Sequence, residues 1–502
     1  MVLFPLRCLA PALIALFALT TGSVAQAQGL PAAALPAPVL AALAQAKVPP
    51  DAVSMLVVGT DTRNRPLLSH RVTAPMNPAS VMKLVTTYAG LDLLGPAYSW
   101  RTPVLLKGTV RDGTLLGDLY LRGQGDPKLV TEKLWLLLRR VQALGVQRIS
   151  GDIVLDRSAF DLGTPDPGAF DGEPLKPYNA SADALLINYK SLVITFVPDP
   201  ARGVARIAYE PVLASVSLPA SVPLSQATPT ATSSTSPGSA GSCPDYRGQL
   251  KADFSNPARI VFAGTYPIAC GERLWPVAYA DPVSFAGRAV QGMWQEMGGQ
   301  LGGRVRDGAW PTDPQTGAPQ EASFELSSPP LAEVIRDINK YSNNVMAQQL
   351  FLSLAFTPGP SSSMAANPET ARARLAQWWR ERMGEAPLPA LDNGSGLSRQ
   401  SRISASALTR LLQVAYGSPT MPELMSSLPL AGVDGTLKRS QVGPQGAAHL
   451  KTGSLRDVAA AAGYVLSASG QRYVLVAMIN HPNANMAKSA IDALTRWVIQ
   501  DH

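Results

Sequence analysis

The two ends of the chain carry pieces of one α/β unit, and the first piece is too short to fold alone. Residues 52–61 are rich in β-branched side chains and predict a strand, with 67–75 as its hairpin partner. Residues 80–95 have helical spacing and end at a glycine. The last segment, 450–502, predicts three antiparallel strands and an amphipathic helix. We therefore expect both ends to form one domain and the chain between them to be an insertion.

The middle of the chain is predicted to be rich in β-structure. Short alternating runs divided by Gly and Asp fill residues 101–160, and similar runs occur over 185–218. Helical periodicity returns at 283–299 and at 330–356. Residues 219–242 are dominated by Ser, Thr and Pro, which predicts a mobile surface loop. We expect a discontinuous α/β domain around a β-rich insertion, with bounds 29–97, 286–502 and 98–285.

Residues 1–28 predict a secretory signal peptide. A short basic start precedes an apolar run, and small residues near Ala27 mark the expected cleavage site. No cysteine stands beside that site, which argues against a lipoprotein. No later apolar run is long enough to span a bilayer, so we expect an exported, periplasmic protein without a transmembrane segment.

The charge balance excludes some partners. The chain has 43 Lys and Arg against 36 Asp and Glu, a formal net charge of +7. This mild excess fits either an anionic envelope surface or an ordinary soluble surface, and no basic block indicates nucleic acid. The four histidines are scattered without metal-ligand spacing, so we expect no metal and no cofactor.

Two cysteines remain once Cys8 is lost with the signal peptide. Cys243 and Cys270 form an even pair in an exported chain, which favours a disulfide. Two unpaired thiols are the alternative. The disulfide would stabilise the fold by about 3–4 kcal/mol, less any strain, because it restricts the unfolded chain.

The segment NPASVMKL places Ser80 three residues before Lys83, where a helix is predicted to begin. Residues at this spacing share a helix face, so the amine can reach the hydroxyl. Serine is a weak nucleophile unless a base accepts its proton. Lysine can be that base only if burial or a nearby cation lowers its pKa, and lowering it to near neutrality requires about 4–5 kcal/mol. A helix cap at Ser80 beside an exposed Lys83 is the alternative.

Two further motifs can complete such a site. Ser342 and Asn344 form a Ser-x-Asn at a predicted helix end, where a hydroxyl can pass a proton and an amide can hold a carbonyl. Lys451, Thr452 and Gly453 enter a predicted strand, where a lysine and a hydroxyl can bind a carboxylate and a glycine permits close approach of substrate. Taken alone, the first motif is also explained as the polar end of a helix and the second as the exposed polar start of a strand. Together, in this order, they are the signature of penicillin-recognising serine acyltransferases.

The chain resembles the D-alanyl-D-alanine carboxypeptidase/endopeptidase family, the class C low-molecular-mass penicillin-binding proteins. Further matching stretches span nearly all of the expected mature chain: GDLYLRGQGDPKL, GDIVLDRSAFD, SPPLAEVIRDINKYSNN, DNGSGLSR and LPLAGVDGTL. The family carries two extra domains between its first two motifs, which fits the long separation of Ser80 from Ser342. Its second motif is often Ser-Asp-Asn, whereas this chain has Asn343 in the middle.

The resemblance implies the fold of serine β-lactamases and DD-peptidases and a role for each motif residue. Ser80 would attack the carbonyl between two D-alanines, and Lys83 would take its proton. Ser342 would pass that proton to the leaving amine. Asn344 would orient the substrate. Lys451, with Thr452 and Gly453, would recognise the terminal carboxylate. The backbone N–H groups of Ser80 and Ser454 would form the oxyanion hole.

The resemblance also implies partners and a specificity site. Peptidoglycan stem peptides would be substrates, and β-lactams would acylate Ser80 and leave slowly. Arg399 and Asp171 fall where the family is thought to bind the zwitterionic third residue of the stem. A surface salt bridge or ordinary loop charges explain these two residues equally well.

Two other functions stay open. A β-lactamase or esterase on the same scaffold would need an acid that activates water. A non-catalytic wall-binding protein would have no need of Lys83. The balance between carboxypeptidase and endopeptidase activity depends on the inserted domains, and the sequence allows a homodimer without specifying one.

Overall fold

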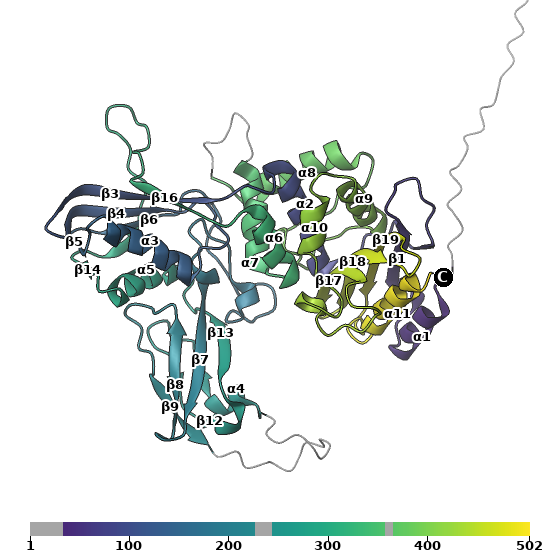
Figure 1. Ribbon diagram of the computed structural model, residues 1–502, viewed down its shortest axis with the longest axis horizontal. Coiled ribbons are helices and arrows are strands. Elements are labelled where there is room, and N and C mark those ends of the chain that lie inside the picture. Colours follow the sequence, from purple (N-terminus) through teal and green to yellow (C-terminus); the bar gives the residue numbers. More distant parts are fainter. Residues whose placement is uncertain (1–33, 226–242, 357–364, 502) are drawn as a thin grey trace, which may run out of the picture.

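The computed structural model describes residues 34–225, 243–356 and 365–501. The predicted signal peptide and its cleavage site at Ala27 lie outside these residues. No helix within the described ranges has the length and apolarity needed to cross a membrane. In Figure 1 the two ends of the chain form one body, and the middle of the chain forms two further sheets beside it.

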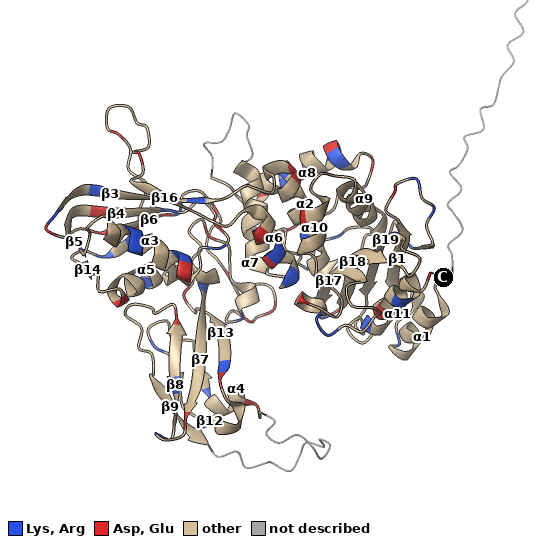
Figure 2. Ribbon diagram, in the orientation of Figure 1, with Lys and Arg blue, Asp and Glu red and all other residues tan. Residues whose placement is uncertain are grey.

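A five-stranded antiparallel sheet built from both ends of the chain organises the first body. Its order is β17-β18-β19-β1-β2, with bounds Ala448–Leu455, Val458–Leu466, Arg472–Asn480, Val53–Gly59 and Leu68–His70. Leu56 of β1 belongs to one hydrophobic core and Val57 to another, on the opposite face. Because both faces are covered, β1 and β18 contain no charged residue (Figure 2). The predicted hairpin and the three predicted C-terminal strands are confirmed.

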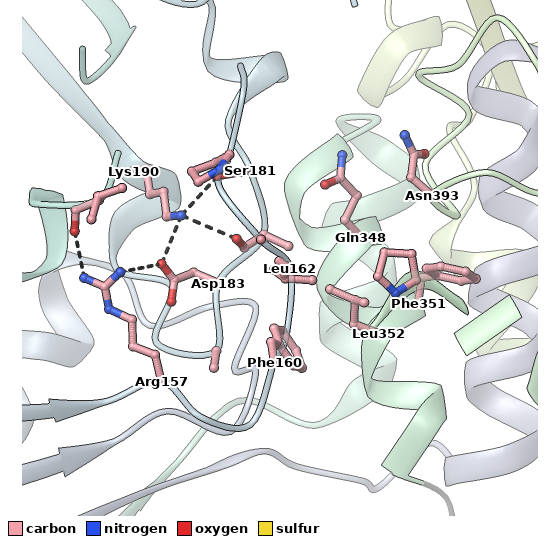
Figure 3. Close-up of a pocket in the computed structure, with 16 residues that line it drawn as sticks. Arg157, Phe160, Leu162, Ser181, Asp183, Lys190, Gln348, Phe351, Leu352 and Asn393 are labelled. Carbon is pink, nitrogen blue, oxygen red and sulfur yellow. Dashed lines mark hydrogen bonds and ion pairs between the residues drawn. The ribbon is translucent and has the colours of Figure 1, made fainter. Parts of the chain in front are cut away.

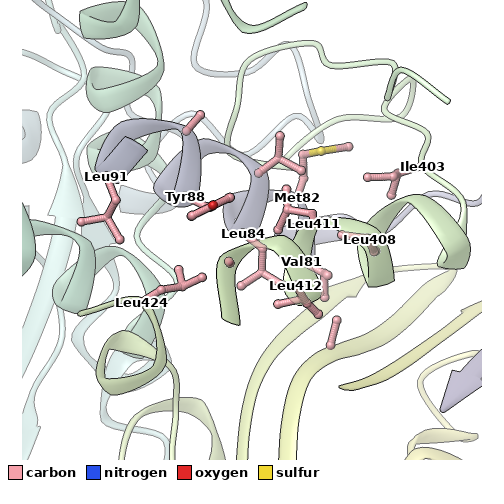
Figure 4. Packing of buried hydrophobic residues seen from close by; sticks show 14 of the residues in the cluster. Val81, Met82, Leu84, Tyr88, Leu91, Ile403, Leu408, Leu411, Leu412 and Leu424 are labelled. Atoms are coloured by element: carbon pink, nitrogen blue, oxygen red, sulfur yellow. The ribbon is translucent and has the colours of Figure 1, made fainter. Parts of the chain in front are cut away.

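Helices cover both faces of this sheet. α1 (Ala37–Gln45) and α11 (Lys488–Ile499) pack together over one face. The helices on the other side are α2, α6, α7, α8, α9 and α10, with bounds Lys83–Leu94, Leu331–Lys340, Asn344–Ser353, Pro368–Met383, Ala405–Tyr416 and Met421–Ser427. Among them, α2 is the central helix: Leu84 and Tyr88 lie in one apolar cluster with Leu408, Leu412 and Leu424 (Figure 4). This packing fixes the start of α2, and with it the preceding turn that carries Ser80, relative to the sheet.

The middle of the chain forms two sheets of its own. The first has the order β14-β5-β4-β3-β16, with β6 beside β4 and β15 beside β6. Its strands, in chain order from β3 to β6 and from β14 to β16, are Arg101–Arg111, Thr114–Arg122, Arg148–Ile149, Ile153–Asp156, Gln300–Leu301, Val305–Asp307 and Phe324–Ser327. Two helices accompany it: α3 (Thr131–Ala143) and α5 (Phe285–Glu296).

The second sheet of the insertion has the order β12-β9-β8-β7-β13. Its strands, in chain order, are β7 (Ser191–Asp199), β8 (Val204–Glu210), β9 (Ser221–Ser225), β12 (Tyr266–Pro267) and β13 (Arg273–Ala278). The short α4 (Tyr246–Leu250) and the β10–β11 pair, Ala252–Asp253 and Val261–Phe262, complete it. The predicted disulfide between Cys243 and Cys270 is present in this unit.

The end of the insertion differs from the prediction at residue 285. β16 pairs antiparallel with β3, with Phe324 opposite Val104, and Trp294 of α5 is buried in the core of the inserted sheets. The chain therefore returns to the first body only at Ser328, whose backbone N–H donates to the carbonyl of Trp100. We propose that the insertion spans residues 99–328 and that the remaining described residues form the peptidase domain.

Two local predictions also need correction. The amphipathic helix α3 lies inside a region that was predicted to be rich in strands and for which no helix was predicted. Residues 221–225, in the predicted loop 219–242, form β9 because Val222 packs into the core and the strand pairs with both β8 and β12. Residues 226–242 lie outside the described part of the chain.

Candidate active site

Ser80 lies in a 3₁₀ turn, Ala79–Met82, that leads directly into α2. Ala79 has φ +46°, a left-handed conformation that residues with a side chain seldom adopt. The side-chain carbonyl of Asn77 accepts a hydrogen bond from the N–H of Ala79 at 2.9 Å and supports this turn. As a result, Oγ of half-buried Ser80 and Nζ of Lys83 lie 3.0 Å apart.

The amine of Lys83 is fully buried among three oxygen atoms. Nζ lies 2.6 Å from Asn344 Oδ1, 2.6 Å from the carbonyl oxygen of Ser395 and 3.0 Å from Ser80 Oγ. Burial lowers the pKa of Lys83 well below its ordinary value, and the charge of Lys451 lowers it further. A neutral amine has two N–H groups for the two carbonyl oxygens and one lone pair for the hydroxyl of Ser80. The site therefore favours an uncharged amine that accepts from Ser80.

A second buried lysine lies on the other side of the site. Nζ of Lys451, on β17, donates to Ser342 Oγ at 2.9 Å and to the carbonyl of Thr452 at 2.8 Å. Burial lowers the pKa of Lys451 to about 7. Ser342 has φ +57° in the turn between α6 and α7. The structure thus brings the Ser-x-Asn and Lys-Thr-Gly motifs together, through Ser342 and Lys451.

Asn344, the first residue of α7, joins the peptidase domain to the insertion. Its Oδ1 accepts from Lys83, and its Nδ2 donates to the carbonyl of Tyr178 at 3.0 Å. Tyr178 belongs to a 3₁₀ turn of the insertion, Pro177–Asn179. The amide is therefore oriented at both ends, and a loop of the insertion forms one wall of the site.

β17 is an edge strand, and its second half lies against the turn of Ser80. A side chain at Gly453 would overlap the carbonyl of Pro78 and come within 3.1 Å of the backbone nitrogen of Ser80. The absence of a side chain at Gly453 therefore permits this contact between β17 and the turn of Ser80. Thr452 Oγ1 lies 2.7 Å from Thr436 Oγ1 at the same edge.

Ser454, the residue after this glycine, is exposed on β17. Its Oγ donates to Asn485 Oδ1 at 2.8 Å. Asn485 also donates to the carbonyls of Leu455 and Arg456, at 2.7 and 3.0 Å. These bonds fix the backbone of β17 immediately beyond the Lys-Thr-Gly motif.

Arg399 and Asp171 lie near enough to each other for their charges to interact. Arg399 forms an exposed ion pair with Asp457 at 2.9 Å, and its guanidinium lies 5.0 Å from the ring centre of Phe170. It also lines a cavity of about 390 Å³ between the insertion and residues 392–400.

Asp171 is held in place by its own loop. It accepts from the hydroxyl of Tyr178 at 2.9 Å and from Asn179 Nδ2 at 2.7 Å. Burial opposes ionisation, but these hydrogen bonds and the charge of Arg399 lower the pKa of the Asp171 carboxyl. The surface salt bridge considered from the sequence thus exists for Arg399, with Asp457 as its partner, and the charge of Arg399 also acts on Asp171.

Sequence reasoning missed three contributors to the site. Ser395 and Tyr178 act through backbone carbonyls, which leave no residue-type signal. The third is Lys340, whose buried ammonium pairs with Asp434 at 2.7 Å and so joins α6, ahead of Ser342, to the loop before β17. Ser395 and Lys340 lie within stretches that match the family, but no role followed from that match, and Tyr178 lies outside all of these stretches.

The sequence matches one known protein family over most of its length. Residues 36–500 match the model of the D-Ala-D-Ala carboxypeptidase 3 (S13) family. The chain is 28% identical over 450 residues to a D-alanyl-D-alanine carboxypeptidase of Actinomadura sp., covering 88% of this chain and 80% of that protein. It is 25% identical over 422 residues to the D-alanyl-D-alanine carboxypeptidase DacB of Haemophilus influenzae, covering 81% of this chain and 80% of that protein.

The fold is also similar to a solved structure. Penicillin binding protein 4 (DacB) from Haemophilus influenzae superposes with a TM-score of 0.67 at 21% identity, covering 88% of this chain and 96% of that one. The predicted fold class and the predicted family are both confirmed. The chain belongs to the D-Ala-D-Ala carboxypeptidase 3 (S13) family, and it is a serine peptidase.

Proposed function

We propose that this protein is an exported DD-peptidase that cleaves peptidoglycan stem peptides through an acyl-enzyme on Ser80. The observation that carries the proposal is the environment of Lys83. Within the described part of the chain its buried amine makes no hydrogen bond to an acid, and its two N–H groups suit the two carbonyl oxygens 2.6 Å away. The lone pair is then available to the hydroxyl of Ser80, at 3.0 Å.

Acylation begins when Ser80 Oγ attacks the carbonyl carbon between two D-alanines. Lys83 takes the hydroxyl proton as the Oγ–carbon bond forms. Negative charge then develops on the carbonyl oxygen, and the backbone N–H groups of Ser80 and Ser454 are the proposed donors to it. One such donor contributes about 3–4 kcal/mol to lowering the barrier. The contact of Gly453 with the turn of Ser80 supports this assignment, because it brings β17 beside the backbone nitrogen of Ser80.

Collapse of the intermediate breaks the carbon–nitrogen bond. The leaving D-alanine nitrogen needs a proton, and Ser342 passes it one that derives from Lys83. Lys451 donates a hydrogen bond to Ser342 Oγ at 2.9 Å and so orients this hydroxyl. When charged, Lys451 binds the terminal carboxylate together with Thr452. Water then attacks the acyl-enzyme, the carbon–Oγ bond breaks, and Ser80 recovers its proton.

The remaining assignments concern the substrate. Asn344 holds the amide of the acyl group, and Arg399 with Asp171 binds the head group of a zwitterionic third residue. Opposite charges facing an amino acid head group support the last assignment. A β-lactam would acylate Ser80 in the same way. The similar protein of Haemophilus influenzae has been solved in complex with a β-lactam, at a TM-score of 0.64 and 21% identity.

The alternatives are a β-lactamase or esterase and a non-catalytic wall-binding protein. A β-lactamase needs an acid that activates water. Among the described residues, the hydrogen-bond partners of the Ser80, Lys83 and Ser342 side chains include no Asp or Glu. A wall-binding protein has no use for a buried neutral amine beside a hydroxyl.

One assay separates the three functions. The protein without residues 1–28 is incubated with a fluorescent penicillin and, separately, with a disaccharide pentapeptide. We expect stable labelling and release of D-alanine. Label that vanishes within seconds supports a β-lactamase, and no label supports a wall-binding protein. Ser80→Ala should abolish labelling, whereas Ser342→Ala, a serine of the same cleft, should slow labelling and retain it. Labelled Ser80→Ala protein would refute the assignment of the nucleophile.

A further inference from the structure

A cavity of about 370 Å³ lies where the insertion meets α7, beyond the proposed site for the third stem residue. Figure 3 shows a polar wall from the insertion and a mainly apolar wall opposite. The charged residues of the polar wall are Arg157, Asp183 and Lys190. Phe160 and Leu162 of the insertion and Phe351 and Leu352 of α7 supply apolar surface.

The polar wall holds two cations for one carboxylate. Lys190 Nζ lies 2.9 Å from Asp183 Oδ2, and Arg157 Nη1 lies 3.2 Å from the same oxygen. A second carboxylate, that of Asp307, lies 3.2 Å from Arg157 Nε. It is mostly exposed and does not line the cavity. The cavity wall therefore has an excess of positive charge.

Arg157 retains hydrogen-bonding capacity. Its Nη1 donates to Asp183 and its Nη2 to the carbonyl of Val283 at 2.8 Å, so each terminal nitrogen keeps one further N–H. Ser181 accepts from Lys190 at 3.1 Å through its oxygen, which leaves its O–H as a donor. These donors can bind the two oxygens of a carboxylate, as arginine commonly does.

The cavity adjoins the one that Arg399 lines. Ser181, Gln348 and Asn393 line both cavities. Gln348 lies one turn of α7 beyond Asn344, a rise of about 6 Å. The side-chain amide of Gln348 has no hydrogen-bond partner among the described residues, so it is available to a peptide backbone that crosses from one cavity to the other.

We propose that this cavity binds the acidic residue that precedes the diamino acid in the stem peptide, through its free α-carboxylate on Arg157 and Ser181. The proposal rests on the proposed function, because the third residue must lie between Arg399 and Asp171 for its predecessor to reach the cavity. In a stem peptide this predecessor is a glutamate joined through its side-chain carboxyl, which leaves the α-carboxylate free. Its methylene groups suit the apolar wall.

The buried ammonium of Lys190 supports the proposal. Burial lowers the pKa of Lys190, although Asp183 opposes this effect. A second anion in the cavity would stabilise the ammonium, so recognition of a carboxylate and retention of the charge on Lys190 favour each other.

The test compares two stem pentapeptides that differ only at the second residue. One carries the free α-carboxylate, and the other carries an α-carboxamide of the same size. We expect the wild-type protein to hydrolyse the carboxylate form with a kcat/KM at least about tenfold higher, since a hydrogen bond to a charged group is typically worth this much. A wild-type ratio near one would overturn the proposal, whereas no hydrolysis of either peptide would overturn the proposed function.

Variants then locate the preference. Arg157→Gln should bring the ratio close to one, and Ser181→Ala should reduce it by a smaller factor while disturbing no ion pair. Lys128→Met is the matched control, because Lys128 pairs with Asp337 across the same junction at 2.6 Å without lining the cavity. Its ratio should equal that of the wild type. Penicillin labelling of each variant reports folding, and an unchanged ratio in labelled Arg157→Gln protein would refute the assignment.

Discussion

The burial of Lys451 makes stability depend on pH in a direction that can be measured. Its pKa lies near 7 in the folded protein, against 10.5 for a lysine in water. Between these values the unfolded chain binds a proton that the folded protein does not, so the free energy of unfolding rises as the pH increases. At about 1.4 kcal/mol for each pH unit, this contribution amounts to about 5 kcal/mol over the whole range and about 2 kcal/mol between pH 7 and 9.

Lys451→Met removes this contribution and keeps the apolar stem of the side chain. The substitution also deprives Ser342 Oγ and the Thr452 carbonyl of a donor. That loss, about 1 kcal/mol for each hydrogen bond, is the same at every pH. Lys83 keeps its low pKa through burial but loses the second cause, the charge of Lys451, so its share of the pH dependence shrinks as well. The slope of stability against pH, rather than its absolute value, is therefore diagnostic.

The assay is urea unfolding of both proteins at pH 7, 8 and 9, followed by tryptophan fluorescence. We expect the wild type to gain about 2 kcal/mol more than Lys451→Met between pH 7 and 9. Parallel curves for the two proteins would mean that Lys451 is charged throughout this range, and the argument from burial would then be wrong. The variant should also lose recognition of substrates that end in a free carboxylate, measured as a raised KM.

Three further outcomes are expected. Penicillin acylation should slow as the pH falls through the lowered pKa of Lys83, because the ammonium form cannot accept the proton of Ser80; a rate that is constant between pH 5 and 9 would contradict this. Gly453→Ala should reduce the labelling rate about 100-fold, because the added methyl group displaces the turn of the nucleophile, and wild-type labelling would show that the turn tolerates it. Replacing both Cys243 and Cys270 by Ser should lower the free energy of unfolding of the second inserted sheet by about 3–4 kcal/mol. The rate of penicillin labelling should not change, and an altered rate would show that this sheet is coupled to the cleft.

The elements that the sequence predicted well are those with a local signal. α11 has a helical periodicity that one stretch of chain carries by itself, β1 is rich in β-branched residues, and α2 ends at a glycine. The end of the insertion has no such signal. β16 is four residues long, and it belongs to the inserted sheet because it pairs with β3, more than 200 residues earlier in the chain. Strand pairing at this separation is a property of the folded protein.

The residues of the candidate site also fall into those with a local signal in the sequence and those that only the fold brings together. Ser80 and Lys83 could be paired from the sequence because three residues in a helical turn fix their distance. The meeting of Ser342 with Lys451 could be inferred only because motif order implied one cleft. The carbonyls of Ser395 and Tyr178 could not be predicted, since every residue has a carbonyl and only the fold decides which one is in reach.

Buried lysines elsewhere in the chain explain why Lys83 and Lys451 are unusual. Lys190 and Lys340 are also buried, and each contacts a carboxylate: the ion pairs are Lys190 with Asp183 and Lys340 with Asp434. A carboxylate stabilises the ammonium, so these two amines are suited to hold structure or bind anions.

Among the described residues, the amines of Lys83 and Lys451 instead form hydrogen bonds only with uncharged oxygens. Burial without a counter-charge destabilises their ammonium forms, and each charge would also repel the other. A substrate carboxylate that binds at Lys451 would favour the charged form there. The added charge would in turn keep Lys83 neutral at the moment when Ser80 must lose its proton, so substrate recognition and activation of the nucleophile would be linked through two amines.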